Sequence, residues 1–342
     1  MTMQDNQNVF FSIIVPAFNV EKYIRRAISS ILNQSFKDFQ LIVVNDGSTD
    51  NTLNIINEFS NENSKITVIN HLKNESLHMV RLNGVAAATG KYIVFLDGDD
   101  YFAENAFAEL YKSIQENPGY DIYEYGHIRQ PSGDIVFPAL LDSNRFLLFF
   151  GRENSPWQSM CNKVFLSTLI KKAFASMEQV YITNIEDLYE SIVVAFYTDR
   201  IFIIKKVIMN YQIGSGVSTT YRDYNKTIEY LDSVKRVVDL VKLFLSRHEL
   251  NISCDDFEYR ILEFAAHHYI RSQKDTDDLK KLFSLLPEFF NVRIIIEYLV
   301  SVEESYKKLS ISRKEILSSK DYRIGRTLLK PMRMLKRLFK IQ

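Results

Sequence analysis

The chain has 342 residues, of which 46% are hydrophobic, and its 42 Lys and Arg residues balance 42 Asp and Glu residues. With 11 Gly and 7 Pro, this composition excludes a collagen-like, low-complexity or disordered chain. The neutral total argues against a bulk nucleic-acid binder, which usually carries a basic excess.

Four short apolar runs in the first third of the chain are predicted to be buried strands. They lie at residues 10–15, 39–44, 66–69 and 92–96. Apolar residues recur with a helical period between these runs, at residues 24–31, 53–59 and 79–89. Continuous apolar strands that alternate with helices favour a parallel sheet covered on both faces, so we predict an α/β fold. In such a sheet, ligands bind beyond the carboxyl ends of the strands.

The rest of the chain divides by its pattern into two further parts. Residues 120–220 mix short strand and helix signals, whereas the pattern becomes helical from about residue 222. We therefore predict a first domain over residues 1–220, a helical C-terminal domain over 221–320 and a basic amphipathic tail over 321–342.

Clustered carboxylates follow the fourth predicted strand, in the sequence Asp97-Gly98-Asp99. Two acidic side chains spaced by one residue and presented by a turn can approach one divalent cation, and Mg²⁺ and Mn²⁺ favour such oxygen ligands. A bound metal would neutralise a leaving diphosphate. The alternative is an exposed acidic turn, because a bare D-x-D is common.

A second acidic pair, Glu186-Asp187, precedes an apolar run with a helical period. Two acids in the first turn of a helix are favoured by the helix dipole alone. A carboxylate that faces a substrate hydroxyl can instead serve as a general base. The residues themselves leave both interpretations open.

Several other classes of site lack their sequence signals. The chain holds no P-loop, G-x-G-x-x-G, H-E-x-x-H or G-x-S-x-G motif. Its two cysteines, Cys161 and Cys254, lie far apart and outside any C-x-x-C, so no disulfide framework or zinc site is indicated.

Four motifs, in order and at the predicted strand ends, resemble glycosyltransferase family 2. They are residues 12–19 (SIIVPAFN), 43–50 (VVNDGSTD), 81–93 with Arg81, Gly84 and ATGKYI, and 95–100 (FLDGDD). The resemblance implies a GT-A fold, which is a Rossmann-like, mostly parallel sheet with flanking helices, here followed by a helical C-terminal region. It also implies a metal-dependent, inverting transfer of a sugar from a nucleotide-sugar, UDP by family tendency, with Mn²⁺ or Mg²⁺ as the metal.

The same resemblance assigns roles to individual residues. It places Asp187 as the base that deprotonates the acceptor hydroxyl, with Glu186 in that role if the register is shifted by one. Asp99 would bind the metal, and Asp97 would lie near both the metal and the ribose. The nucleotide pocket would be formed by Pro16, Ala17, Phe18, Asn19, Asp46 and Arg81.

The resemblance also has limits in this sequence. Residue 82 is Leu where the family usually has Asn, and residue 212 is Gln where many members have Arg. Lys163 and Trp157 are candidate contacts to the acceptor or to phosphate, although packing is the commoner role of a lone Trp.

The acceptor implied by the family is a glycan or a lipid-linked glycan precursor, as in bacterial surface polysaccharide synthesis. The alternative is a catalytically silent nucleotide-sugar-binding or scaffolding protein on the same fold. A nucleotidyltransferase would usually need a Gly-rich, basic loop after the first strand, which residues 19–22 do not supply.

The neutral net charge hides an uneven distribution. Seven basic residues and no acidic residue lie in residues 323–342, where apolar residues recur every three or four positions. This pattern is typical of a basic amphipathic helix on an anionic membrane, and equally of a terminal helix that packs on its own domain. Because the chain shows neither a secretory signal nor an apolar segment of bilayer length, we expect a cytoplasmic protein, peripheral at the inner face of the membrane if the tail binds there.

Overall fold

The computed structural model describes residues 9–138, 145–150, 159–182, 184–214, 224–254 and 257. The chain divides into two compact units, and the candidate site lies in the first, which residues up to 219 form together with 232–254. The predicted tail at residues 321–342 lies outside the described residues. None of the helices in these ranges combines the length and the apolar character needed to cross a bilayer.

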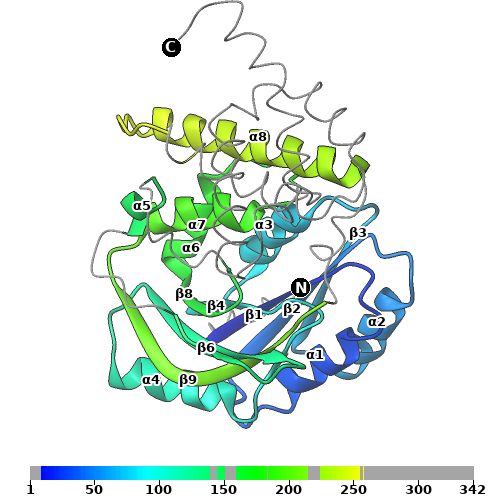
Figure 1. Ribbon diagram of the computed structural model, residues 1–342. Helices are drawn as coiled ribbons and strands as arrows, with labels where there is room; N and C mark the ends of the chain where they lie inside the picture. The colour runs from blue at the N-terminus through cyan, green and yellow to red at the C-terminus, as the bar shows by residue number, and fades with distance from the viewer. Residues whose placement is uncertain are drawn as a thin grey trace, which may run out of the picture. The chain divides into compact units, whose positions relative to one another are not determined.

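The first half of the chain alternates strands and helices as its hydrophobic pattern predicts (Figure 1). The elements in chain order are β1 (Phe11–Ala17), α1 (Ile24–Leu32), β2 (Phe39–Asp46), α2 (Thr52–Glu62), β3 (Ile66–His71), α3 (Leu77–Ala87), β4 (Tyr92–Phe95), β5 (Tyr101–Phe102), α4 (Ala106–Glu116), β6 (Ile122–Gln130), β7 (Ile135–Val136), α5 (Arg145–Leu148), β8 (Lys163–Leu166), α6 (Ser167–Ala175), α7 (Glu186–Tyr197), β9 (Ile201–Gln212) and α8 (Tyr224–Arg247).

In the described part of the chain, nine strands form one sheet, in the order β3-β2-β1-β4-β8-β6-β9-β5 with β7 beside β6. The first four strands are parallel, with β1 between β2 and β4. Strand β8 then runs antiparallel to both β4 and β6, and β9 returns parallel to β6. The predicted α/β class is confirmed, but the complete sheet is mixed because the strands after β4 add antiparallel pairs.

Helices cover both faces of this sheet (Figure 1). Helices α1, α2 and α4 lie on one face, and α3, α6 and α7 lie on the other. Strand β1 is buried along its whole length, as expected of a central strand covered on both sides. At Gly84 of α3, an added Cβ would meet Cγ2 of Ile14 at 2.5 Å, so the absence of a side chain lets this helix approach β1 closely.

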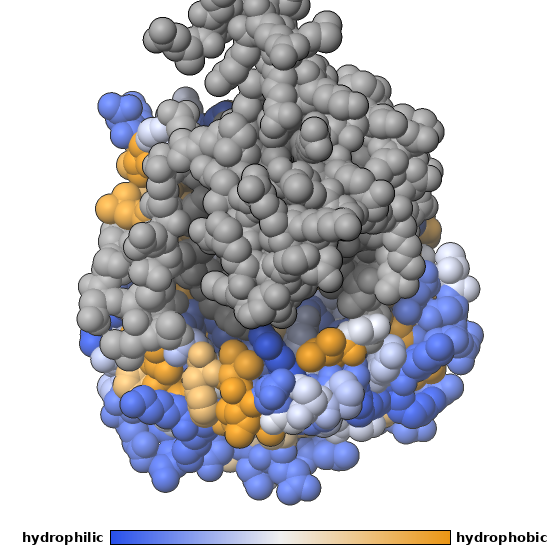
Figure 2. Space-filling model, viewed as in Figure 1, coloured by the Kyte–Doolittle hydropathy of each residue, from blue (hydrophilic) through white to orange (hydrophobic). Residues whose placement is uncertain are grey.

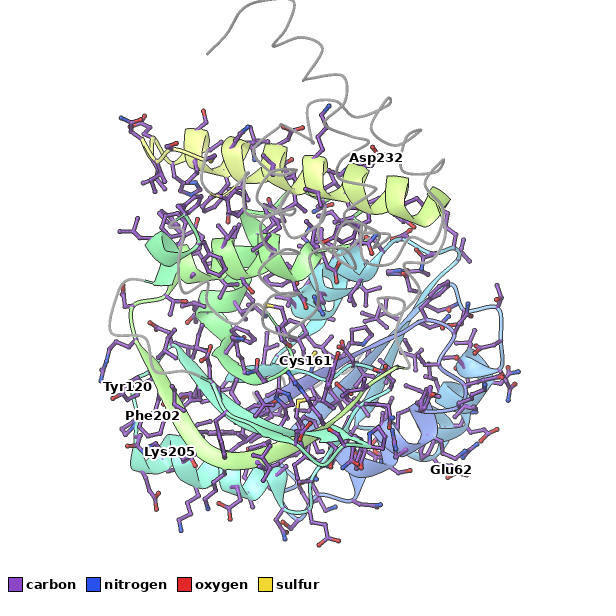
Figure 3. All side chains as sticks on the ribbon, viewed as in Figure 1. Glu62, Tyr120, Cys161, Phe202, Lys205 and Asp232 are labelled. Atoms are coloured by element: carbon purple, nitrogen blue, oxygen red, sulfur yellow. The ribbon has the colours of Figure 1, made fainter. Side chains whose placement is uncertain are left out.

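The outer strands of the sheet bend and carry aromatic side chains. A register shift between β6 and β9 lies near Tyr125 and Gly126, and β9 curves strongly across the molecule (Figure 1). Tyr120 and Phe202, labelled in Figure 3, pack with ring centroids 5.2 Å apart.

In Figure 2, hydrophilic side chains cover the side of α1 and α4, and hydrophobic side chains gather in a band above them.

Candidate functional site

Three of the predicted segments meet at one edge of the sheet because β1, β2 and β4 are parallel neighbours. The segments are residues 16–19 after β1, 46–50 after β2 and 97–100 after β4. An added Cβ at Gly98 would meet the carbonyl oxygen of Pro16 at 2.8 Å, so the acidic turn lies directly against the end of β1. The structure therefore brings together the residues that the sequence placed at strand ends.

The segment after β1 is fastened to the loop after β2. Asn19 has a positive φ of 52°, and its backbone N–H donates to Oγ of Ser48 at 3.1 Å. Its Oδ1 accepts from the Thr49 backbone N–H at 2.8 Å. Pro16 and Ala17 are buried, whereas Phe18 and Asn19 are exposed, so the last two are the side chains this segment offers to a ligand.

Asp46 is engaged mainly by the chain itself. It is 3% exposed and accepts from the backbone N–H groups of Glu75 at 2.8 Å and Ser76 at 3.1 Å. Nδ1 of His71 lies 2.8 Å from Oδ1 of Asp46, and Nε2 lies 2.9 Å from the Asn83 amide. The ring thus donates to Asp46 and accepts from Asn83, an assignment made from the network. Asp46 fixes the loop before α3, and its contact with a base stays a prediction.

The turn after β4 holds three acidic side chains close together. Burial raises the pKa of Asp97 to about 6, with Asp99 adding to the rise and Arg81 opposing it. Burial and the carboxylates of Asp97 and Asp99 raise the pKa of Asp100 to about 9. Within the described residues, Oδ1 of Asp97 and Oδ2 of Asp100 are buried without a hydrogen-bond partner. These features suit a cation at the turn.

The donor set fits a metal that shares its coordination with substrate. No group of three or more His, Cys, Asp or Glu side chains in the described ranges is arranged to hold a metal. Asp97 and Asp99 are the two carboxylates of the turn that the sequence predicts as metal ligands. Mg²⁺ is commonly held by one or two carboxylates together with phosphate oxygens and water, so two ligands from the chain are sufficient.

An arginine that the sequence reasoning missed binds the same turn. Nη2 of Arg26 donates to the Asp99 carbonyl oxygen at 3.0 Å and to Oε1 of Gln212 at 3.1 Å. Its guanidinium lies 4.2 Å from the ring centroid of Tyr101. The Gln212 backbone N–H donates to Oδ1 of Asp100 at 2.8 Å. The end of β9 is thereby fastened to the acidic turn.

Arg81 lies at the centre of the candidate site, with a side chain that is 1% exposed. Nη1 pairs with Asp187 and also lies 2.7 Å from Oε2 of Glu190, and Nη2 lies 3.8 Å from Oδ1 of Asp97. Burial lowers the pKa of Arg81, but these three carboxylates reverse the effect and raise its pKa well above the usual value. The cation joins the turn after β4 to the first turn of α7.

The acidic pair on α7 is confirmed as part of a helix's first turn. Burial raises the pKa of Asp187, and Arg81 opposes this rise. Burial and the charge of Asp187 raise the pKa of Glu186 to about 8. The side chain of Asp187 is 35% exposed and that of Asp97 is 33% exposed, so both carboxylates beside Arg81 reach solvent.

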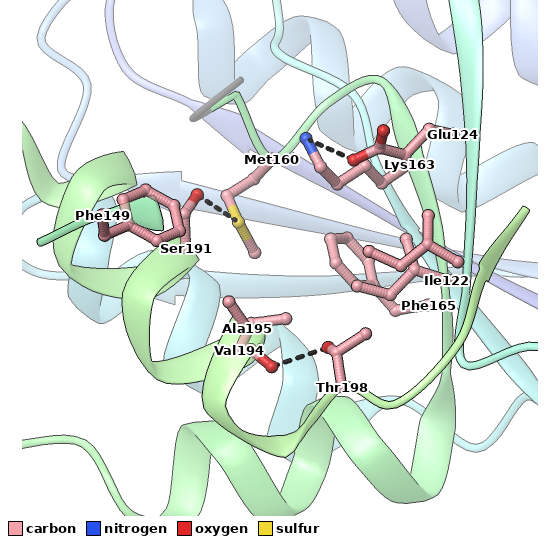
Figure 4. A pocket seen from close by; sticks show the side chains of 11 residues that line it. Ile122, Glu124, Phe149, Met160, Lys163, Phe165, Ser191, Val194, Ala195 and Thr198 are labelled. Carbon is pink, nitrogen blue, oxygen red and sulfur yellow. Dashed lines mark hydrogen bonds and ion pairs between the residues drawn. The ribbon is translucent and has the colours of Figure 1, made fainter. Parts of the chain in front are cut away.

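Lys163 is buried and lines a small pocket between α7 and strands β6 and β8 (Figure 4), and its contact with an acceptor or phosphate stays a prediction. Its Nζ lies 3.7 Å from Oε1 of Glu124 and donates to Oδ1 of Asn162 at 3.0 Å. Cys161, which is labelled in Figure 3, is also buried. Trp157 lies outside the described residues.

The sequence patterns also did not indicate His78 and Glu190, two further residues of the hydrogen-bonded group around Arg81. Both have fully buried side chains, and Nδ1 of His78 lies 2.9 Å from Oε1 of Glu190. Glu190 follows Asp187 by three positions, a spacing that places two side chains on the same face of a helix. That spacing was the available signal for Glu190, whereas His78 gave none before α3 was placed against α7.

Comparison with known proteins finds similarity to glycosyltransferases. Residues 12–174 match the family model described as Glycosyl transferase family 2. The chain is 39% identical over 137 residues to EpsJ of Bacillus subtilis, an uncharacterised glycosyltransferase. The aligned region covers 40% of this chain and 39% of EpsJ. It is 38% identical over 132 residues to the hyaluronan synthase of Pasteurella multocida, covering 38% of this chain and 14% of the synthase. The chain thus spans well under half of the length of these relatives.

A solved structure extends the likeness over most of the fold. S. aureus TarS 1–349 in complex with UDP-GlcNAc superposes with a TM-score of 0.58 over 94% of this chain and 92% of that one, at 19% sequence identity. At this identity the likeness shows the fold alone. The predicted GT-A-like arrangement is thereby confirmed, while the boundaries at residues 220 and 320 stay predictions.

Proposed function

We propose that this chain, which residues 12–174 place in glycosyltransferase family 2, is a metal-dependent inverting transferase that moves a sugar from a nucleotide-sugar to a hydroxyl group of a glycan or lipid-linked glycan precursor. One observation carries the proposal. Asp97 and Asp187, from two different elements, both reach solvent and share the buried cation of Arg81. A donor-side carboxylate and a candidate base therefore border the same space.

The donor side is the edge where β1, β2 and β4 end. We assign the nucleotide to residues 16–19 and the loop that Asp46 fixes, with the diphosphate near the acidic turn. Asp97 and Asp99 would hold Mn²⁺ or Mg²⁺, which would offset the charge of the leaving diphosphate. UDP is our choice of nucleotide, supported by the UDP-GlcNAc that the TarS neighbour binds.

The acceptor side is the first turn of α7. Asp187 accepts the proton of the acceptor hydroxyl as the acceptor oxygen attacks the anomeric carbon. The bond from that carbon to the diphosphate oxygen breaks on the opposite face, so the configuration inverts in a single displacement. Arg81 favours the ionised form of Asp187, because its charge opposes the effect of burial on the pKa of Asp187. Glu186, whose pKa is about 8, is the less ready proton acceptor near neutral pH.

The acceptor class is a polysaccharide or its precursor. This choice is supported by a relative that is named a hyaluronan synthase.

The test is a screen of the full chain with UDP-, GDP- and TDP-sugars and Mn²⁺. Thermal unfolding reports binding, because a ligand of the native state raises the melting temperature. Release of the nucleoside diphosphate, with and without glycan acceptors, reports turnover. We expect stabilisation by one nucleotide class and release that depends on an acceptor. Binding without release would instead identify a silent nucleotide-sugar-binding protein. The absence of both binding and release would overturn the proposal.

A further inference from the structure

A buried polar array lies behind the candidate site, between α3 and α7. Its members are His78, Arg81 and Glu190, and each side chain is at most 1% exposed. Nε2 of His78 lies 2.9 Å from the carbonyl oxygen of Glu178, which anchors the far end of the array. Charged groups this deeply buried are costly unless partners satisfy them. The array therefore has a defined geometry.

Glu190 divides its two oxygens between the other two members. Oε2 accepts from Nη1 of Arg81 at 2.7 Å, and Oε1 lies 2.9 Å from Nδ1 of His78. Nη1 of Arg81 is shared with Asp187, which holds Glu190 and Asp187 to the same nitrogen. Any change at Glu190 thus reaches Asp187 through one guanidinium group.

We propose that Glu190 and His78 form a positioning pair that holds Arg81 between Asp187 and Asp97, so that the candidate base and the donor-side carboxylate share one cation. This inference rests on the proposed function for its catalytic consequence. Neither residue touches a substrate in the proposed mechanism. Their role is to fix the cation and to set the charge that Asp187 experiences.

The charges around Asp187 determine in which direction its pKa should move when Glu190 is changed. Asp187 faces Arg81 from α3, Glu186 and Glu190 from its own helix, Lys163 from β8 and Asp97 from the turn after β4. Arg81 and Lys163 lower the pKa of Asp187, whereas Glu190 raises it. Removal of the Glu190 charge alone is therefore expected to make Asp187 more acidic.

Glu190→Gln removes this charge while retaining the hydrogen bonds. The amide oxygen can still accept from Arg81. The amide nitrogen can donate to Nδ1 of His78, whose Nε2 then donates to the Glu178 carbonyl. Glu109→Gln is the matched control, because it removes from α4, on the opposite face of the sheet, a carboxylate that is paired with Lys206.

The experiment follows the pH dependence of kcat/KM and, independently, the titration of Asp187 by carbon NMR of protein labelled at the Asp carboxyl groups. The Asp187 signal is assigned with Asp187→Asn. We expect Glu190→Gln to shift both the acid limb and the carboxyl titration downward by about one pH unit, a shift within reach of one nearby charge. Glu109→Gln should shift neither.

Arg81→Lys is a variant for which we expect the pKa of Asp187 to move in the opposite direction. An ammonium group keeps the charge but cannot form the same fork to several carboxylates, so the titration of Asp187 should move upward. An Asp187 titration that is unmoved in both variants would overturn the inference. The NMR titration needs no turnover, so a shift without activity would support the inference while the proposed function failed.

Discussion

Arg81 of helix α3 donates from Nη1 to Oδ1 of Asp187 in helix α7, across 106 positions of the sequence. The carboxylate that the motif predicts as a base is therefore held by a buried cation. An ion pair of this kind keeps a partly buried carboxylate ionised and fixes its direction, both of which a general base requires.

The first prediction separates Asp187 from its neighbour Glu186. Asp187→Asn keeps the oxygen that accepts from Arg81 but cannot take up a proton, so kcat should fall by about 100-fold or more. Nucleotide binding should stay as in the wild type, which thermal shift with UDP and Mn²⁺ checks. Glu186→Gln should retain most activity. The reverse ranking, with the larger loss at Glu186, would assign the base to that residue.

The second prediction concerns the metal. Removal of divalent cations with EDTA should reduce turnover by more than about 100-fold, because a Lewis-acid metal stabilises the charge of the transition state by several kcal/mol. Added Mn²⁺ or Mg²⁺ should restore it. Asp99→Asn should weaken the Mn²⁺-dependent part of UDP binding measured by calorimetry. Equal UDP affinity with and without Mn²⁺, together with turnover in EDTA, would show that the turn after β4 acts without a metal.

Local patterns were sufficient for the first part of the fold. The β-branched runs before Pro16, Asp46 and Asp97 are continuous because β1, β2 and β4 are covered on both faces, and this composition predicts buried strands. The parallel arrangement then places the three strand ends at one edge. The acidic turn at residues 97–100 was located for the same reason.

Tertiary packing decided the rest of the site. Arg81 lies on a helix whose sequence gives no sign that its side chain points inward to Asp187 and Glu190. The cost of its burial is offset mainly by these two carboxylates, which lie more than 100 positions away. Lys163 is a second case. The sequence gives no sign that β8 runs antiparallel between β4 and β6, which places the buried Lys163 side chain beside Glu124.

The third prediction tests the close approach between the acidic turn and β1. Gly98→Ala places a Cβ 2.8 Å from the Pro16 carbonyl oxygen and 3.1 Å from Cγ2 of Val20. Backbone must shift to accept it, at a cost of about 1–3 kcal/mol in the free energy of unfolding. UDP affinity should fall as well, because the turn moves. Urea unfolding and calorimetry measure the two effects.

A second glycine provides the control for this variant. Gly133 has a φ of +79°, and an added Cβ would meet nothing within 4 Å. Gly133→Ala should therefore cost about 1–2 kcal/mol of stability through backbone strain alone. UDP affinity should be unchanged. A donor affinity that fell equally in both variants would trace the loss to general destabilisation.

The fourth prediction concerns stability and pH. Burial and Asp187 raise the pKa of Glu186 to about 8 from an ordinary 4.5, so the folded chain keeps a proton that the unfolded chain releases. The contribution of Glu186 to stability therefore falls as the pH rises through this window. Glu186→Gln stays neutral, so its melting temperature relative to the wild type should rise between about pH 5 and pH 8. The hydrogen bond from Lys206 lowers the pKa of Glu109, so Glu109→Gln should show no such slope. A flat difference for Glu186→Gln would mean that Glu186 is ionised in the folded protein throughout.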